Sequence, residues 1–90
     1  IRNGTPLLRQ VTGTGCMLSV LTASFLGASP ETPLDAAAAA VCMMGLCGEQ
    51  AAARLQGPEG TGTLRTYLID AVSRLTPEQL DKGANYELYP

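Results

Sequence analysis

The chain contains no histidine and no tryptophan, and it has a single phenylalanine among its 90 residues. Without histidine it cannot build a Ser-His-Asp or Cys-His catalytic group or a Cys₂His₂ zinc site, and it lacks the usual proton carrier near neutral pH. Aromatic residues make up only 4% of a sequence that is 46% hydrophobic. A domain of this size that stands alone usually relies on aromatic side chains, disulfides or a metal. We therefore expect a piece of something longer.

Basic residues and cysteines are also few. Six Lys and Arg against eight Asp and Glu give a net charge of -2, so no basic stripe exists and we expect no nucleic-acid partner. Three cysteines cannot form a disulfide framework, which favours a reducing compartment such as the cytoplasm. No signal peptide is visible at the start. The longest uncharged apolar stretch, residues 36–48, falls short of the ~18 residues expected of a membrane-spanning helix, so we expect no membrane partner.

The first residues indicate a β-hairpin followed by a strand. Asn3-Gly4 is the strongest short signal for a type I′ turn, because both residues tolerate a positive φ. Residues 6–11 then read as a strand that leads into a glycine-rich turn. Almost no incoming strand precedes the turn, which again indicates the C-terminal part of a longer protein. A strand, a glycine turn and a helix would suit the edge of a sheet in a layered α/β fold.

The rest of the chain reads as helical. Apolar spacing and end signals predict helices over about residues 16–27, 33–55 and 63–74. The second should be buried on most sides, because residues 36–46 offer no polar face. Thr76-Pro77-Glu78-Gln79 is a capping box that opens a short last helix, which Gly83 ends before a surface tail over residues 84–90.

The feature most informative about chemistry is the turn Thr12-Gly13-Thr14-Gly15-Cys16. At the start of a helix the first backbone N–H groups are unpaired and the macrodipole favours negative charge, so a phosphate is the natural guest. Cys16 would lie beside that anion, where the helix end favours a thiolate that could act as a base. The plainer alternatives are a tight connection between two elements and a small buried hydrophobe that starts a helix.

Residues 11–19 closely resemble the hydroxyethylthiazole kinase family of the ribokinase-like superfamily. The similarity covers roughly residues 6–75 in order, and it continues through Ala23-Ser24-Phe25-Leu26, Ala40-Val41-Cys42-Met43-Met44-Gly45, Gly48-Glu49-Gln50-Ala51-Ala52, Gly60-Thr61-Gly62-Thr63-Leu64-Arg65 and Leu68-Ile69-Asp70-Ala71. It implies a ribokinase-like layered α/β fold. This chain would supply the mostly helical C-terminal segment, residues 1–90, of one kinase domain, with the hairpin or strand at its start.

The resemblance also implies a reaction and a site. Family members use ATP and Mg²⁺ to phosphorylate the primary hydroxyl of 4-methyl-5-(2-hydroxyethyl)thiazole, and they form homotrimers. By matching position, Cys16 would be the catalytic residue and Gly13 a substrate-binding residue. The backbone amides of Gly13, Thr14, Gly15 and Cys16 would form the anion hole. The family's ATP-contacting residues lie mostly in the rest of the enzyme, so this chain alone should be inactive.

Two other functions compete with this one. Hydroxymethylpyrimidine kinase, from the same superfamily, also uses a Gly-Thr-Gly-Cys turn, although Val11-Thr12 before the turn, Met17-Leu18-Ser19 after it and residues 48–52 favour the thiazole enzyme. A non-enzymatic helical assembly module would explain the apolar second helix but not the turn.

The loop before the third helix also departs from the family's usual Gly-Pro-Gly-Ser-Phe.

The remaining candidate residues are better explained by packing or solvation. Cys42 and Cys47 lie about 140° apart around a helix, so they make a poor metal pair and a better pair of core residues. Glu49 reads as part of a solvated helix face. We therefore expect no metal site within this chain.

Overall fold

The structure is a computed structural model that describes residues 1–87. It consists of helices joined by loops. A short 3-10 helix, η1 (Pro6–Gln10), is followed by four α-helices in this range, namely α1 (Thr14–Ala28), α2 (Pro33–Arg54), α3 (Thr61–Arg74) and α4 (Pro77–Gly83). None of residues 1–87 lies in a strand. The body is elongated, with extents of 44 × 22 × 22 Å.

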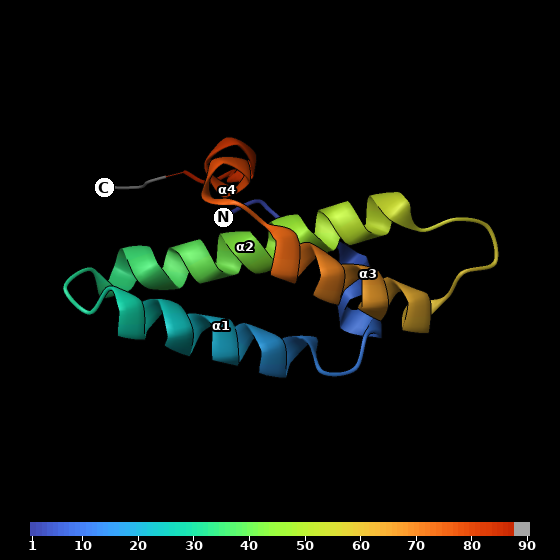
Figure 1. Cartoon of the computed structure of the whole chain (residues 1–90), viewed down its shortest axis with the longest axis horizontal. Coiled ribbons are helices and arrows are strands. Elements are labelled where there is room, and N and C mark those ends of the chain that lie inside the picture. The colour runs from blue at the N-terminus through green and yellow to red at the C-terminus, as the bar shows by residue number, and fades with distance from the viewer. Residues whose placement is uncertain (88–90) are drawn as a thin grey trace.

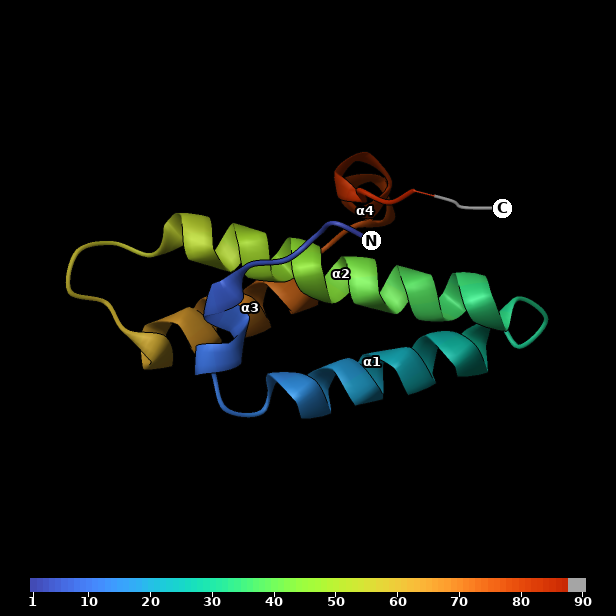
Figure 2. The same ribbon diagram turned by 180° about the vertical axis from the view of Figure 1, so that it is seen from behind.

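Helix α2 is the centre of the arrangement and contacts all the other helices. Helix α1 runs beside it in the opposite direction, α3 packs along its C-terminal half, and α4 lies against its other side (Figure 1). The view from behind shows the first residues of the chain crossing α2 on their way to η1 (Figure 2). The glycine-rich turn then connects η1 to α1 at the opposite end of α1 from the α1–α2 loop.

The helix ends follow their local sequence signals. Thr32 is the N-cap residue of α2 and Pro33 takes its first position, although the Thr32 side chain makes no capping hydrogen bond. At α4 the capping box is complete. The Gln79 N–H donates to Thr76 Oγ1 at 3.2 Å, and the Thr76 N–H donates to Gln79 Oε1 at 3.0 Å. The predicted helices are therefore confirmed, with bounds that differ by a few residues.

The core lies between α2, α3 and the residue that precedes the glycine turn. Leu64 and Leu68, one turn apart on α3, are 2% and 0% exposed. They pack with Val11 and with small or flexible side chains of α2, namely Met44, Cys47 and Ala51. Small residues on α2 let the two helices approach closely, which explains how a core forms here with so few aromatic residues.

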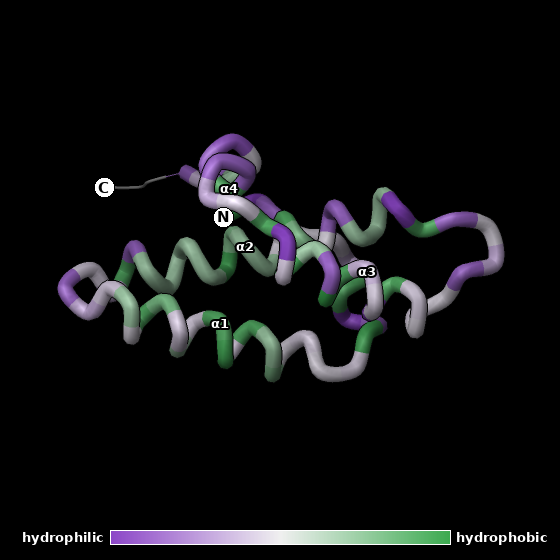
Figure 3. The backbone as a smooth tube through the Cα atoms, viewed as in Figure 1, coloured by the Kyte–Doolittle hydropathy of each residue, from purple (hydrophilic) through white to green (hydrophobic). Residues whose placement is uncertain are grey.

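Helix α1 differs from α2 and α3 because none of its residues is buried. It is nevertheless one of the most apolar segments of the chain (Figure 3). One side rests on α2 through half-buried residues such as Leu18 and Leu21, whereas Val20 is 65% exposed. An apolar helix with an open side is typical of a helix that packs against further protein.

The prediction of a hairpin and strand at the start was wrong. Asn3 does not have a positive φ, so no type I′ turn forms, although Gly4 has a φ of 138°. Residues 6–10 form η1 because Pro6 favours the first helical position, the Leu7 N–H donates to the Thr5 side chain, and no neighbouring strand is present within residues 1–87. A strand without a partner would leave its backbone groups unpaired.

The predicted surface tail is partly anchored. The Arg2 N–H donates to the carbonyl oxygen of Asn85 at 2.6 Å, and the Arg2 side chain forms an ion pair with Glu87. The two described ends of the chain thus lie together against α2 and α4. Residues 88–90, the rest of the expected tail, lie outside the described residues.

Helix α2 is long and apolar enough to cross a membrane by length and composition. In the most apolar window of this helix, 44% of the residues are buried inside the protein. Core helices of soluble proteins meet the same criterion, so one such helix is only weak support for a membrane location.

Candidate functional site

The turn before α1 depends on glycine because of its backbone conformation. Gly13 is the N-cap residue of α1 and has a φ of 96°, which L-residues with a side chain rarely adopt. A Cβ placed on Gly13 or Gly15 would meet nothing within 4 Å. The space beside both glycines is open to solvent, so a bulky group can approach the backbone directly.

The first amides of α1 face this open space without partners from the helix. The first hydrogen bond of the helix runs from the Met17 N–H to the Gly13 carbonyl oxygen, at 2.9 Å. The amides of Thr14, Gly15 and Cys16 therefore precede the hydrogen-bond ladder of the helix. Three successive free donors at the positive end of a helix are suited to bind an oxyanion.

Two contacts fix the turn to the rest of the molecule. Val11, directly before it, is 4% exposed and belongs to the core. The Thr14 hydroxyl lies 3.0 Å from the carbonyl oxygen of Leu8 and 3.3 Å from that of Val11, so it can donate to either. The Thr14 side chain thus ties the start of α1 to the end of η1 while its amide stays in the row of free donors.

Cys16 is the exposed cysteine of the three. It lies in the first turn of α1, directly beside the free amides. Cys42 and Cys47 are buried, and burial raises the pKa of both thiols, that of Cys47 to about 11. The prediction that these two are core residues is confirmed. Cys16 is therefore the most accessible of the three thiols.

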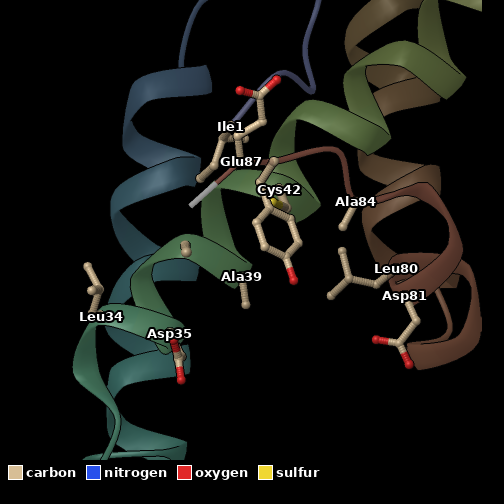
Figure 4. A pocket seen from close by; sticks show the side chains of 11 residues that line it. Ile1, Leu34, Asp35, Ala39, Cys42, Leu80, Asp81, Ala84 and Glu87 are labelled. Atoms are coloured by element: carbon tan, nitrogen blue, oxygen red, sulfur yellow. The ribbon is translucent and has the colours of Figure 1, made fainter. Parts of the chain in front are cut away.

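Two pockets lie elsewhere on the molecule. One of about 470 Å³ is lined by α2, α4 and the two described ends of the chain, including Leu34, Cys42 and Leu80 (Figure 4). The other, of about 140 Å³, lies between α2, α3 and α4. Neither is lined by a residue of the turn, so the candidate site is an open surface to which other protein could supply the remaining walls.

Nothing in the described part of the chain suggests a resident metal. Within residues 1–87 no three Cys, Asp or Glu side chains are grouped so that they could hold an ion. The donor set of the turn consists of backbone N–H groups, which bind anions and not cations.

Comparison with known proteins assigns the chain to a family. The family model described as "Hydroxyethylthiazole kinase family" matches residues 1–78. The chain belongs to the hydroxyethylthiazole kinase family. The match includes η1, the glycine-rich turn, α1, α2 and α3.

Individual members of the hydroxyethylthiazole kinase family agree with this assignment. The chain is 47% identical to the hydroxyethylthiazole kinase of Clostridium acetobutylicum over 89 residues, which is 99% of this chain and 33% of that protein. It is 41% identical over 85 residues to a hydroxyethylthiazole kinase of Cereibacter sphaeroides, covering 94% of this chain and 30% of that protein. A relative of the same name from Zea mays is 34% identical over 90 residues, 100% of this chain and 31% of the relative.

The chain spans about a third of the length of these curated relatives. No solved structure matches it.

The predicted site residues come together in this family member. Gly13, Thr14, Gly15 and Cys16 are consecutive around one exposed helix start. The sequence interpretation missed the role of the Thr14 hydroxyl, and it treated Glu49 as solvated. Glu49 is half-buried and accepts hydrogen bonds from residues 3 and 4. No local signal near Glu49 indicated this role, because its partners are more than 40 positions away.

Proposed function

We propose that this chain is the C-terminal, phosphoryl-binding segment of a hydroxyethylthiazole kinase. The complete enzyme would transfer the γ-phosphoryl group of ATP to the primary hydroxyl of 4-methyl-5-(2-hydroxyethyl)thiazole. The observation that carries the proposal is the open turn at Gly13, where unpaired amides lie next to the exposed thiol of Cys16. Membership of the kinase family gives that turn its chemical context.

The amides of the turn would bind the phosphoryl group during transfer. Charge spreads over the three equatorial oxygens of that group in the transition state, and donors already in place stabilise it without reorganisation. The amides of Gly13 to Cys16 form the proposed anion hole. Backbone donors suit this role because the core at Val11 and the Thr14 hydroxyl hold them in position.

Cys16 would act as the base for the acceptor alcohol. Its thiolate takes the hydroxyl proton while the alcohol oxygen forms a bond to the γ-phosphorus. The bond from that phosphorus to the bridging oxygen breaks, and ADP leaves with the electron pair. Because phosphoryl transfer has a loose transition state, proton removal contributes less than charge stabilisation, and the amides would supply the larger share.

Gly13 would lie against the thiazole alcohol. The absence of a side chain and the empty space around its Cα let a substrate approach the reacting centre at this point. Every relative compared above carries the name hydroxyethylthiazole kinase, which favours the thiazole alcohol over the hydroxymethylpyrimidine alternative.

The remaining parts of the site would come from the rest of the enzyme. The turn fits the phosphate end of ATP, whereas residues 1–87 contain no ligand cluster for Mg²⁺, which neutralises phosphate charge in such reactions. Its protein ligands would lie outside this chain. The open side of α1 supports the proposal that this chain packs into a ribokinase-like domain. We also propose a homotrimer in the cytoplasm, with no nucleic-acid or membrane partner.

An ATP-consumption assay of the complete protein tests the proposal. The thiazole alcohol and hydroxymethylpyrimidine are supplied in parallel, with each compound lacking its hydroxyl as the matched control. We expect ATP turnover with the thiazole alcohol and none with its deoxy analogue. Faster turnover with the pyrimidine alcohol would show that the protein is a hydroxymethylpyrimidine kinase instead. Turnover with neither alcohol would overturn the kinase proposal.

A further inference from the structure

The residues at the start of the chain lie directly on the backbone of α2. A Cβ on Gly45 would come within 2.6 Å of the Asn3 backbone, and one on Gly48 within 2.8 Å of the Leu8 side chain. Residues 3–8 therefore lie close along α2, and glycine is required at Gly45, where the neighbouring atoms are backbone, whereas at Gly48 the Leu8 side chain could move aside. These two contacts fix the position along α2 at which η1 packs.

Polar contacts hold the first residues in that position. The Gly4 N–H donates to Glu49 Oε1 at 3.0 Å, and Asn3 Nδ2 lies 3.5 Å from Glu49 Oε2. Asn3 Nδ2 also donates to the Gly83 carbonyl oxygen at 2.8 Å, and Asn3 Oδ1 accepts from the Asn85 N–H at 2.6 Å. Asn3 thus joins α2 to the end of α4, and Glu49 is the only charged member of the group.

The same segment leads without a break to the phosphoryl-binding turn. From Gly4 the chain enters η1, whose Leu8 carbonyl accepts from the Thr14 hydroxyl at 3.0 Å. Thr14 is the first residue of α1 and carries one of the free amides. Only nine residues lie between Gly4 and Thr14, and five of them are fixed in η1. A displacement at Glu49 would therefore move the turn.

From this continuity we infer that Glu49 is a positioning residue for phosphoryl transfer. The Glu49 carboxylate fixes residues 3 and 4, and these residues determine where η1 and its residue Leu8 lie. The hydrogen bond between Leu8 and Thr14 then orients the amides of the anion hole. Glu49 does not contact the reacting groups. The inference rests on the proposed function for its catalytic consequence, but the mechanical link from Glu49 to the turn stands on the contacts alone.

The test uses Glu49→Gln in the complete protein, with Glu31→Gln as a control for the same exchange at an exposed loop carboxylate. Glutamine keeps the size of the side chain but directs a donor at Asn3 or Gly4, which are themselves donors. We expect kcat to fall roughly tenfold to hundredfold, as small displacements of catalytic groups do, with KM unchanged. The control should match the parent protein.

A second variant, Thr14→Val, removes the hydroxyl and keeps the amide and the side-chain shape. If Glu49 acts through Leu8 and Thr14, the double variant should be no slower than the slower single variant, because both changes break the same connection. Losses of kcat that multiply would contradict the link. A lower melting temperature with unchanged kcat in Glu49→Gln would also overturn it, since that result is expected of a purely structural residue.

Hydrogen exchange separates this inference from the proposed function. The Met17 N–H, bonded to the Gly13 carbonyl, reports on the start of α1. We expect its exchange to accelerate in Glu49→Gln and Thr14→Val but not in Glu31→Gln, whether or not the protein turns over a thiazole alcohol. Unchanged exchange in both variants would overturn the positioning role, whereas absent turnover in the parent protein would overturn the kinase proposal alone.

Discussion

At the scale of single residues, the turn illustrates how backbone conformation sets chemistry. Gly13 is required for its φ of 96° and not for space, since a Cβ there would meet no other atom within 4 Å. Forcing an L-residue into this region costs about 1–2 kcal/mol. Relief of that strain would rotate the peptide units that carry the free amides. The same glycine therefore affects both local stability and the shape of the proposed anion hole.

Gly13→Ala should lower the free energy of unfolding by about 1–2 kcal/mol and reduce phosphoryl transfer. Gly62→Ala is the matched control. Gly62 has an ordinary helical conformation and empty space around it, so alanine there should be neutral or stabilise α3 by up to about 1 kcal/mol. Denaturant unfolding and initial rates measure both effects. Equal unfolding free energies and equal initial rates for the two variants would show that alanine can adopt the Gly13 conformation without strain.

Exposure and pKa also predict which cysteine reacts. At pH 8 an alkylating reagent should label Cys16 first, because Cys42 and Cys47 are buried and burial raises the pKa of the Cys47 thiol to about 11. The two buried thiols stay protonated at this pH, since their pKa values lie above the ordinary value of 9.0. Mass spectrometry of peptides identifies the site. Cys16→Ser should remove the fast phase of alkylation. A fast phase that persists in this variant would contradict the burial of Cys42 and Cys47.

At the scale of elements, the four α-helices within residues 1–87 could be predicted because their signals are local. Thr32-Pro33 begins α2, and the box from Thr76 to Gln79 begins α4. The start of the chain could not be predicted in this way. The partners of Asn3 lie 46, 80 and 82 positions away, so nothing near it in the sequence distinguishes a hairpin turn from a group that joins α2 to α4. The same distance concealed the role of Glu49.

The glycines of α2 give a test of the packing between α2 and residues 3–8. Gly45→Ala should destabilise the protein by about 1–3 kcal/mol, because the new Cβ would lie 2.6 Å from the Asn3 backbone and the segment must shift. Gly48→Ala should cost less. There the Cβ meets only the end of the Leu8 side chain, which can rotate, and alanine adds up to about 1 kcal/mol of helix propensity.

Chemical denaturation of the complete protein measures this difference. We expect Gly45→Ala to be the less stable of the two and to lose more activity, since its shift is passed to η1. A larger loss for Gly48→Ala would show that the segment from Asn3 to Leu8 lies differently on α2.

At the scale of the whole molecule, the chain has the character of a part that packs against more protein. α1 is apolar and has no buried residue, the candidate site is open, and the chain covers about a third of its relatives. An exposed apolar helix beside an incomplete site is consistent with burial of α1 in the complete kinase domain. If the chain is a segment of such a domain, as proposed, its low aromatic content would reflect a core that is shared with the rest of the enzyme.

A substitution at Val20 tests whether further protein covers the open side of α1. Val20→Lys should destabilise the complete protein by about 1–3 kcal/mol if further protein covers α1, because the change would bury an unpaired charge or displace the helix. Ala53→Lys, at an exposed position of α2, should change stability little. Thermal unfolding compares them. Equal stability of both variants would show that the open side of α1 stays in solvent.

In the proposed reaction, Cys16 and the amides beside it make the contacts to the reacting groups. The decisive measurement is kcat of the complete protein with ATP and the thiazole alcohol for Cys16→Ala and Cys16→Asp. Alanine should lower kcat by about a hundredfold, the lower range for the loss of a catalytic base, and aspartate should retain or raise it because a carboxylate can take the same proton. Unchanged turnover in Cys16→Ala would contradict the account.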